Sequence, residues 1–250
     1  MPPTADLLPS TYRSTRSGLH RVAAHILARR RFDVSGHFGL RASPGGFATP
    51  AFGADPETLR VAGTTLVREM GGASESMEMA GSTLRDLASF AGTDLEKDFS
   101  CGDDTPALGD IDVALDLDAA AASVVAGWYD LGWQVLDIVV AALPAQAAPV
   151  AIQLWPEHFD AGTHVGLSSG ERVNLGFSPG DSFETEPYAY LGPWSARRPG
   201  DPSFWNAPFG AVLRRSAAHD GHGAHGADGG QTPTACRQFM EAGLEHLLGP

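Results

Sequence analysis

A nine-residue pattern occurs twice in this chain and constrains its fold more than any other feature. The frame F-D-x-x-x-H-x-G-L is found at 32–40 and again at 159–167. In both copies the Asp and the His are four residues apart, so on an extended strand their side chains would share a face. A helical pattern precedes each copy and a Ser-Pro-Gly turn follows each. We therefore predict two related halves, each a helix followed by antiparallel sheet.

Apolar periodicity predicts three long helices. Between 11 and 30 the apolar residues recur at helical spacing and would form one buried stripe. A second helix is expected over 118–143, with Asp118 at its N-cap and Pro144 beyond its end. We expect a third over 234–248, followed by Gly249 and Pro250.

Alternating apolar and polar residues, separated by Gly, Pro and Asn, predict short strands. The segment 74–90 is ambiguous: its end fits a helix, but its start could be extended. The expected strands lie at 32–41, 47–52, 58–68, 155–165, 172–177, 188–191 and 209–215. The predicted fold class is α+β: antiparallel β-sheet in two pseudo-repeated halves, with long helices packed on the sheets.

The chain divides in sequence at an acidic segment. Nine Asp and Glu residues lie between 93 and 118, against the single lysine, Lys97. The segment lacks the calcium-loop pattern, and we interpret it as a solvated linker. The predicted organisation is a first half at 1–92, the linker at 93–118 and a second half at 119–250, together one compact domain.

Charge and cysteine content exclude several classes of partner. A net charge of −13 argues against nucleic acid, whose phosphates need a basic surface, and against anionic membranes. Cys101 and Cys236 have no zinc or disulfide spacing and predict free thiols in a reducing cytoplasm. The first residues lack a signal-peptide pattern. Asp130 and Asp137 interrupt the most apolar run, which predicts a soluble buried helix.

The polar faces of the repeated frames are the candidate site. On a strand over 155–165, His158, Asp160 and His164 would share one face, and Asp33 with His37 would supply matching groups from the other half. Two imidazoles and a carboxylate are suitable ligands for zinc, iron or manganese. Without metal, an Asp would orient a His that acts as general base. The third interpretation is that these side chains are simply solvated.

Three further segments suggest chemistry less directly. The sequence G-x-S-x-G at 166–170 matches the nucleophile elbow of serine hydrolases, but a strand pattern follows it, so we expect a hairpin turn. The glycines at 221–226 match G-x-G-x-x-G without a following helix, and the histidines at 219–225 are an alternative place for adventitious metal. The aromatic-rich segment 183–209 would wall a ligand pocket, with Arg197 and Asn206 as polar groups, or pack over the sheet edge.

Three motifs resemble those of an uncharacterised bacterial family, a domain of unknown function. They are W-x-x-x-F-D at 155–160, G-F-x-P-G-D at 176–181, and E-P-Y-A-Y at 186–190, where the family has E-P-x-x-Y-A-Y. The resemblance covers about half of the chain; the chain is shorter than the family pattern and differs in its His-rich loop. It implies strands at these motifs and no activity, because the family has none assigned.

The function expected from the sequence is binding of a small molecule or divalent metal at the polar sheet faces. The alternatives are a non-enzymatic structural or protein-interaction domain, and a serine hydrolase acting at 166–170. The sequence leaves open whether the protein is an enzyme.

Overall fold

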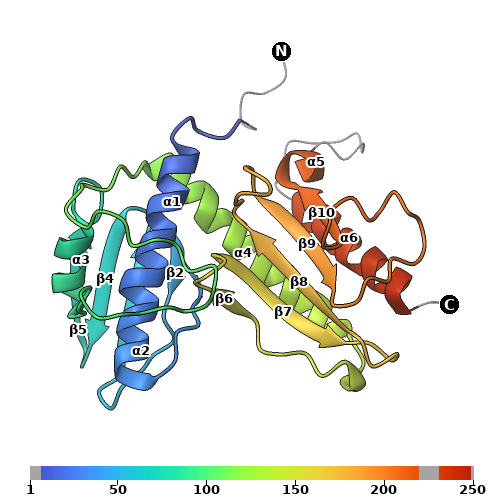
Figure 1. Ribbon diagram of the computed structural model, residues 1–250, viewed down its shortest axis with the longest axis horizontal. Coiled ribbons are helices and arrows are strands. Elements are labelled where there is room, and N and C mark those ends of the chain that lie inside the picture. Colours follow the sequence, from blue (N-terminus) through green and yellow to red (C-terminus); the bar gives the residue numbers. More distant parts are fainter. Residues whose placement is uncertain (1–6, 220–230, 249–250) are drawn as a thin grey trace. The chain divides into compact units, whose positions relative to one another are not determined.

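The computed structural model describes residues 7–219 and 231–248 and has an α+β fold. Its two antiparallel sheets have the strand orders β1-β2-β3-β4-β5 and β10-β9-β8-β7-β6 (Figure 1). The chain forms two compact units. We call them the N-unit, Leu8–Asp130 with Gln153–Asp160, and the C-unit, which begins with Leu131–Ile152 and resumes at residue 161.

The N-unit sheet is a meander of short strands joined by tight turns. Gly45 and Gly63 have φ angles of 78° and 60°, the left-handed conformation that such turns need. Phe47, Leu59 and Leu66 are completely buried. The strands are β1 Arg41–Ser43, β2 Gly46–Ala48, β3 Glu57–Ala62, β4 Thr65–Met70 and β5 Ala73–Glu78. The predicted turn at 43–46 is confirmed, and the strand expected over 58–68 is in fact the β3–β4 hairpin.

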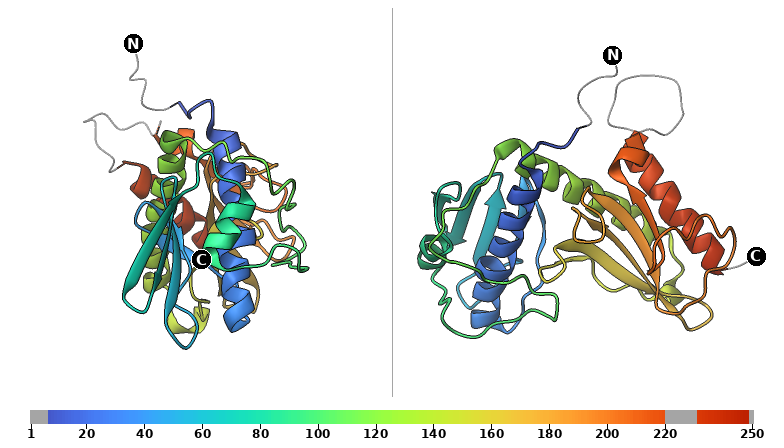
Figure 2. Two further views of the ribbon diagram at one scale, coloured as in Figure 1. Left: turned by 90° about the vertical axis from the view of Figure 1, so that its left-hand side faces the viewer. Right: turned by 45° about the horizontal axis from the view of Figure 1, so that its top comes forward.

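A continuous helix runs along the N-unit sheet in both views of Figure 2. It consists of α1 (Tyr12–Val22), the π-helical segment η2 (Ala23–Ala28) and α2 (Arg29–Ser35). The predicted apolar stripe is buried. The segment 74–90 is strand β5 followed by α3 (Leu84–Ala91), as expected from its mixed pattern; Thr83 and Asp86 form a capping box at the start of α3.

The first copy of the repeated frame is not a strand. Residues 32–35 continue the helix as the last turn of α2, and Gly36 ends it with φ 72° in a left-handed C-cap. Residues 37–39 form a loop, and Leu40 makes a single bridge to Leu154 of β6 (Gln153–Trp155). The four alternating residues 32–35 are compatible with a final helical turn as well as with a strand. Gly36 favours the helix, because a glycine at this position forms a left-handed C-cap. The predicted equivalence of the two frames as strands was therefore wrong.

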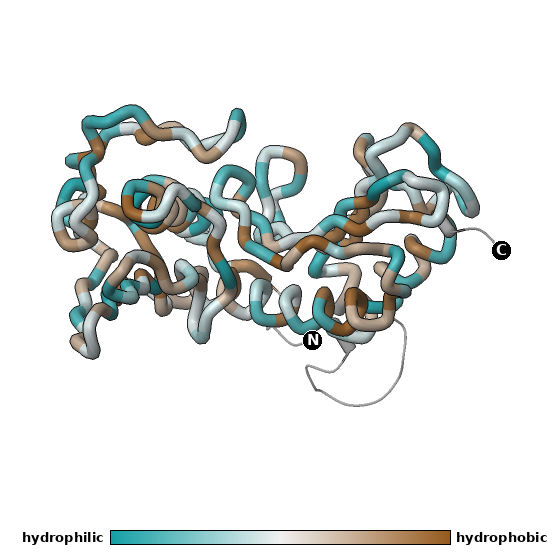
Figure 3. The backbone as a smooth tube through the Cα atoms, turned by 90° about the horizontal axis from the view of Figure 1, so that it is seen from below, coloured by the Kyte–Doolittle hydropathy of each residue, from teal (hydrophilic) through white to brown (hydrophobic). Residues whose placement is uncertain are grey.

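The C-unit carries the longer strands, and both the second half of α4 and helix α6 pack directly on its sheet. Its strands are β7 Asp160–Gly166, β8 Arg172–Ser178, β9 Tyr188–Pro193 and β10 Ala211–Arg214, and its helices are α5 Arg215–His219 and α6 Gln231–Leu248. The predicted strands at 172–177, 188–191 and 209–215 and the predicted C-terminal helix are confirmed. Figure 3 shows hydrophobic stretches along these strands and more hydrophilic loops between them.

The longest helix, α4 (Ala119–Ala142), contributes its first half to the N-unit and its second half to the C-unit. By length and composition alone it is apolar enough to cross a membrane. Its buried residues, such as Val125, Trp128 and Leu136, are covered by protein, while Asp130 and Asp137 lie on an exposed polar stripe. The helix therefore has one buried apolar face and one exposed polar face, whereas the sequence predicted a largely buried helix.

Candidate functional site

The residues expected to form the site lie in different local structures. Asp33 is in the last turn of α2, where its carboxylate accepts a hydrogen bond of 3.0 Å from the Thr93 hydroxyl. His37 is exposed in the loop that follows. Because this segment is helical up to Ser35, Asp33 and His37 do not share the face of a strand.

The second copy is a strand only from Asp160 onward. Residues 156–159 form a turn, and Phe159 has a φ of 55°, which is uncommon for a bulky residue. The predicted strand over 155–165 is therefore interrupted, and His158 lies on the turn, where Nδ1 is 3.4 Å from the Asp104 carboxylate. The expected alternation of His158 with Asp160 and His164 was wrong.

The imidazole and carboxylate groups do not converge on a metal site. Within residues 7–219 and 231–248, no three His, Cys, Asp or Glu side chains are grouped so as to hold a metal ion. Asp160 is buried, whereas His164 lies four residues further along β7, about 13 Å away on an extended strand. His219, His222 and His225 of the His-rich loop, and the glycines at 221–226, fall at or beyond the limit of the described side chains.

His164 belongs to a polar and aromatic surface of the C-unit sheet. Its ring lies 5.3 Å from that of Trp194, whose indole nitrogen donates a 2.7 Å hydrogen bond to Asn174. The Arg172 guanidinium is 5.7 Å from the same indole ring. Partial burial, with a smaller contribution from Arg172, lowers the pKa of His164. This shift favours the neutral imidazole, which packs against the aromatic ring of Trp194.

The turn at 156–159 is held by an aromatic cluster in the N-unit. The ring of His20 stacks on Phe159 at 5.0 Å, and Phe47 and Tyr129 meet it edge-on. Tyr129 donates a 2.7 Å hydrogen bond to the Phe159 carbonyl, and His20 Nε2 donates to the Pro156 carbonyl at 2.9 Å. Burial lowers the pKa of His20 to about 4. These contacts stabilise the left-handed conformation of Phe159, which is a structural role.

Glu157 lies on this turn and is therefore not part of a strand. Its side chain lies against Gly102, and burial raises its pKa. A carboxyl group with a raised pKa suits proton donation.

The G-x-S-x-G segment is a hairpin turn, as expected. It joins β7 to β8, with Gly166 opposite Arg172 in the antiparallel register. A nucleophile elbow must join a strand to a helix so that the serine stands on a strained turn. The serine hydrolase alternative therefore lacks its structural basis, and we do not propose it.

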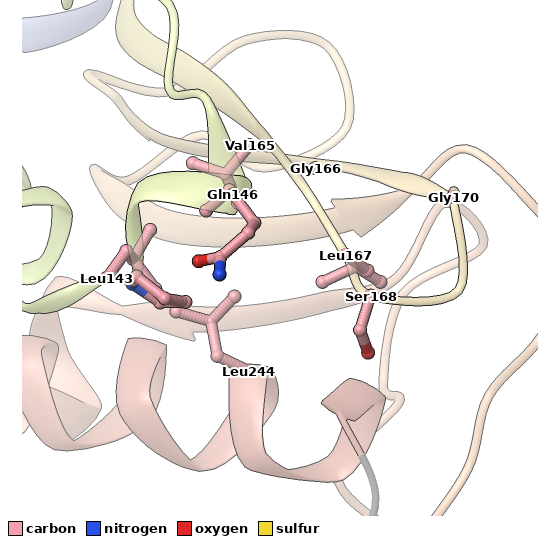
Figure 4. Close-up of a pocket in the computed structure, with 10 residues that line it drawn as sticks. Leu143, Gln146, Val165, Gly166, Leu167, Ser168, Gly170 and Leu244 are labelled. Atoms are coloured by element: carbon pink, nitrogen blue, oxygen red, sulfur yellow. The ribbon is translucent and has the colours of Figure 1, made fainter.

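A pocket of about 550 Å³ lies in the C-unit beside this hairpin (Figure 4). Its walls come from the end of α4 and the following turn, from β7 with its hairpin, and from α6. The lining is mostly aliphatic: Leu143, Pro144, Ala147, Val165, Leu167 and Leu244, with the backbone of Gly166 and Gly170. Gln146 and Ser168 supply the polar groups, and the Gln146 carboxamide points between Leu143, Leu167 and Leu244 in Figure 4.

Gly166 allows the α4 turn to approach β7 closely. A Cβ atom at this position would lie 3.3 Å from the carbonyl oxygen of Ala147. Thr163 also ties this edge, since its hydroxyl donates a 2.6 Å hydrogen bond to the Val150 carbonyl. The pocket therefore has a fixed wall along β7.

The sequence did not predict this pocket. Leu143 and Leu244 are separated by about a hundred residues, and each fits the apolar stripe of its own helix. The only local pattern at this pocket is the G-x-S-x-G hairpin at 166–170, and that pattern suggested a serine hydrolase rather than a binding pocket.

The aromatic-rich segment packs on itself and on α6. Phe204 contacts Trp205, Phe239 and His246 at ring separations of 5.1–5.3 Å. Asn206 is hydrogen-bonded in both directions with the backbone of Val212. The packing interpretation of this segment therefore fits the structure better than a ligand-binding one.

Comparison with protein-family models, with curated protein sequences and with solved structures finds no match to this chain.

Proposed function

We propose that this protein binds a small, largely apolar molecule in the C-unit pocket. The observation that carries the proposal is the combination of size and lining. A volume of about 550 Å³ falls in the range typical of ligand sites, and aliphatic walls with a few polar groups are the usual composition of such sites.

The polar groups suggest what the ligand carries. The Gln146 carboxamide both donates and accepts hydrogen bonds, and the exposed Ser168 hydroxyl lies at the rim. A ligand with one hydroxyl, carbonyl or amide group on an apolar body would satisfy Gln146. Burial of its apolar surface would supply most of the affinity.

Binding without chemistry is the better-supported role for this pocket. None of the described residues that line it has a side chain that titrates, so a general acid or base is not among them. The net charge of −13 also favours a small molecule over nucleic acid or an anionic membrane.

A cytoplasmic location remains our expectation. Cys101 and Cys236 are free and buried in the structure. Unpaired cysteines persist in reducing compartments.

The test uses Nile red, a neutral apolar dye, titrated into the full-length chain. We expect saturable fluorescence at one site, and an affinity about tenfold or more lower in Ser168→Trp, because the indole would block the pocket mouth. Ser169→Trp is the matched control, since Ser169 is equally exposed on the same hairpin but does not line the pocket. Leu244→Asp, with Gln238→Asp on the exposed side of α6 as its control, tests the opposite wall.

Equal dye binding by Ser168→Trp, Ser169→Trp and the unmodified chain would refute the proposal. So would the lack of saturable binding. Circular dichroism of each variant establishes that the fold is retained before affinities are compared.

A further inference from the structure

The N-unit has a second cavity, of about 500 Å³, with the opposite chemistry. It lies between the π-helical part of the long helix and the segment 95–108. His25 and Arg29 line it from the helix side. The other side is formed by the acidic segment, with Glu96, Asp98 and Asp103 among its residues.

Two polar side chains in this cavity are buried with part of their hydrogen-bonding capacity unused. Arg29 is 2% exposed and His25 is 4% exposed. Arg29 Nη1 donates to the Leu95 carbonyl at 3.5 Å, while Nη2 has no hydrogen-bond partner. His25 Nε2 donates to the Pro106 carbonyl at 2.7 Å, which leaves Nδ1 as an unpaired acceptor.

Such groups are costly unless something binds them. A buried donor left without an acceptor destabilises the fold, and the penalty is larger when the group is charged. The Arg29 charge is stabilised by Asp33, Asp94 and Asp98 and by the Phe99 ring at 5.6 Å, but none of these supplies an acceptor to Nη2. Both unpaired atoms are enclosed by protein, so a ligand in this cavity reaches them only when the Arg29 and His25 side chains turn toward it.

The helix is irregular at this point. The π-helical segment Ala23–Ala28 contains His25 and ends immediately before Arg29. Wide π-helical turns inside α-helices are frequent at functional sites, because they displace side chains from the regular spacing. This observation is independent of the unpaired atoms and marks the same two residues.

The distribution of charge indicates the kind of ligand. The buried cation lies on the helix side, whereas the carboxylates of Glu96, Asp98 and Asp103 lie on exposed residues of the segment opposite. Lys97 also lines the cavity, and its ammonium group lies 3.9 Å from the carboxylate of Asp94, which is outside the lining. A ligand with a carboxylate at one end and an ammonium group at the other matches both sides.

We infer that the N-unit binds a free amino acid in this cavity, with its carboxylate at Arg29 and its ammonium group toward the carboxylates of segment 95–108. Arg29 Nη2 donates to the ligand carboxylate, since charge-assisted hydrogen bonds to arginine are among the strongest in proteins. His25 Nδ1 accepts a hydrogen bond from the ligand or from a water that the ligand holds. The site is separate from the apolar pocket of the C-unit and does not depend on it.

The experiment screens the L-amino acids one at a time by thermal unfolding of the full-length chain, and measures affinity for those that stabilise it by calorimetry. Acetate and methylamine, each carrying one of the two charges, are the matched half-ligands. We expect at least one amino acid to raise the unfolding temperature, and both half-ligands to bind at least about tenfold more weakly.

Two variants locate the binding. Arg29→Met keeps the length of the side chain and removes its charge, and we expect affinity to fall about 10- to 100-fold. Asp98→Asn, on the exposed segment, tests the ammonium end without disturbing the core and should weaken binding about two- to fivefold. Arg237→Met, at an exposed ion pair on α6, is the control and should bind normally.

If acetate binds as tightly as the amino acid, the inference that the ligand needs both charges is refuted. If Arg29→Met binds the amino acid with unchanged affinity, the inference that the carboxylate binds at Arg29 is refuted. If Arg29→Met does not fold, an unchanged affinity in Asp98→Asn together with the double variant Glu96→Gln/Asp103→Asn would overturn the proposal. Failure of every amino acid to stabilise the chain would also overturn it.

Discussion

The two units differ in how they bury polar groups. In the N-unit, the buried side chains include His25, Arg29, Glu57 and Asp160, while the buried polar side chains described in the C-unit are the hydroxyl groups of Thr163, Ser178 and Thr232. In the C-unit, three glycines lie in close contact with aromatic rings: Gly132 with Phe177, Gly176 with Tyr190 and Gly243 with Phe204. Stability should therefore depend on charge in the N-unit and on volume in the C-unit.

The charged interior is centred on Glu57. This residue is 2% exposed on β3, and its carboxylate pairs with Arg30 at 2.8 Å and with Arg68 at 2.9 Å. Both arginines are only about one-fifth exposed. The three side chains join the long helix to two strands of the sheet, so loss of the central charge would leave two poorly solvated cations.

The largest effect is expected from Glu57→Ala. Removing one member of a buried ion pair costs about 3–5 kcal/mol, because the remaining charges are left uncompensated. Urea unfolding measures the loss, and amide hydrogen exchange locates it in β3 and β4. Glu57→Gln keeps the acceptor oxygen and should lose less. If the amides of β8 and β9 lose as much protection from hydrogen exchange as those of β3 and β4, the buried charge does not stabilise the N-unit selectively.

Acidification should give the next largest effect. The pKa of His20 is lowered to about 4 by burial, so protonation favours the unfolded state, where the pKa is near 6.5. The stabilising contribution is present above pH 6.5 and is lost as the pH falls toward 4. A pKa shift of this size corresponds to a loss of about 3 kcal/mol in the free energy of unfolding. Burial lowers the pKa of His25 as well, which acts in the same direction.

The measurement is the free energy of unfolding between pH 7 and pH 4. His20→Gln should flatten this profile, since the titrating group is gone while a hydrogen-bond donor remains. A profile that is unchanged in His20→Gln would assign the acid sensitivity to other groups.

The smallest effect is expected from filling space in the C-unit. The ring of Tyr190 lies against Gly176, where an added Cβ would clash with it. Gly176→Ala should destabilise the protein by about 1–3 kcal/mol, as overpacking usually does. Gly127→Ala, in the N-unit half of α4, is the uncrowded control, because nothing lies within 4 Å of that Cβ and alanine favours its helix. Thermal unfolding compares the two, and an equal response would show that volume does not limit the C-unit.

Sequence patterns predicted the helices and most strands because those elements have long, consistent periodicity. The stripe from Leu19 to Leu27, the polar stripe of α4 and the strands β8 and β9 are examples. The frame at 32–40 failed because its period-two pattern covers only four residues before Gly36. Short alternation does not distinguish a helix end from a strand, and a C-cap glycine outweighs it.

The candidate site could not be predicted for a different reason. The sequence proposal rested on an unbroken strand over 155–165, and a turn after Trp155 removed the common face of His158, Asp160 and His164. Both cavities are formed by residues distant in the sequence, and neither has a local motif. An unpaired group such as Arg29 Nη2 is recognised only when its surroundings are known. The resemblance to a bacterial family of unknown function stays a prediction.

The two buried thiols give each unit its own natural reporter. Cys101 lies in the N-unit and Cys236 on α6 of the C-unit, and burial raises the pKa of both, that of Cys236 to about 12. A thiol held in this state reacts with a labelling reagent only when its surroundings open. The rates at which the two cysteines are modified in the unmutated chain would therefore follow local opening in the two units separately, without any introduced probe.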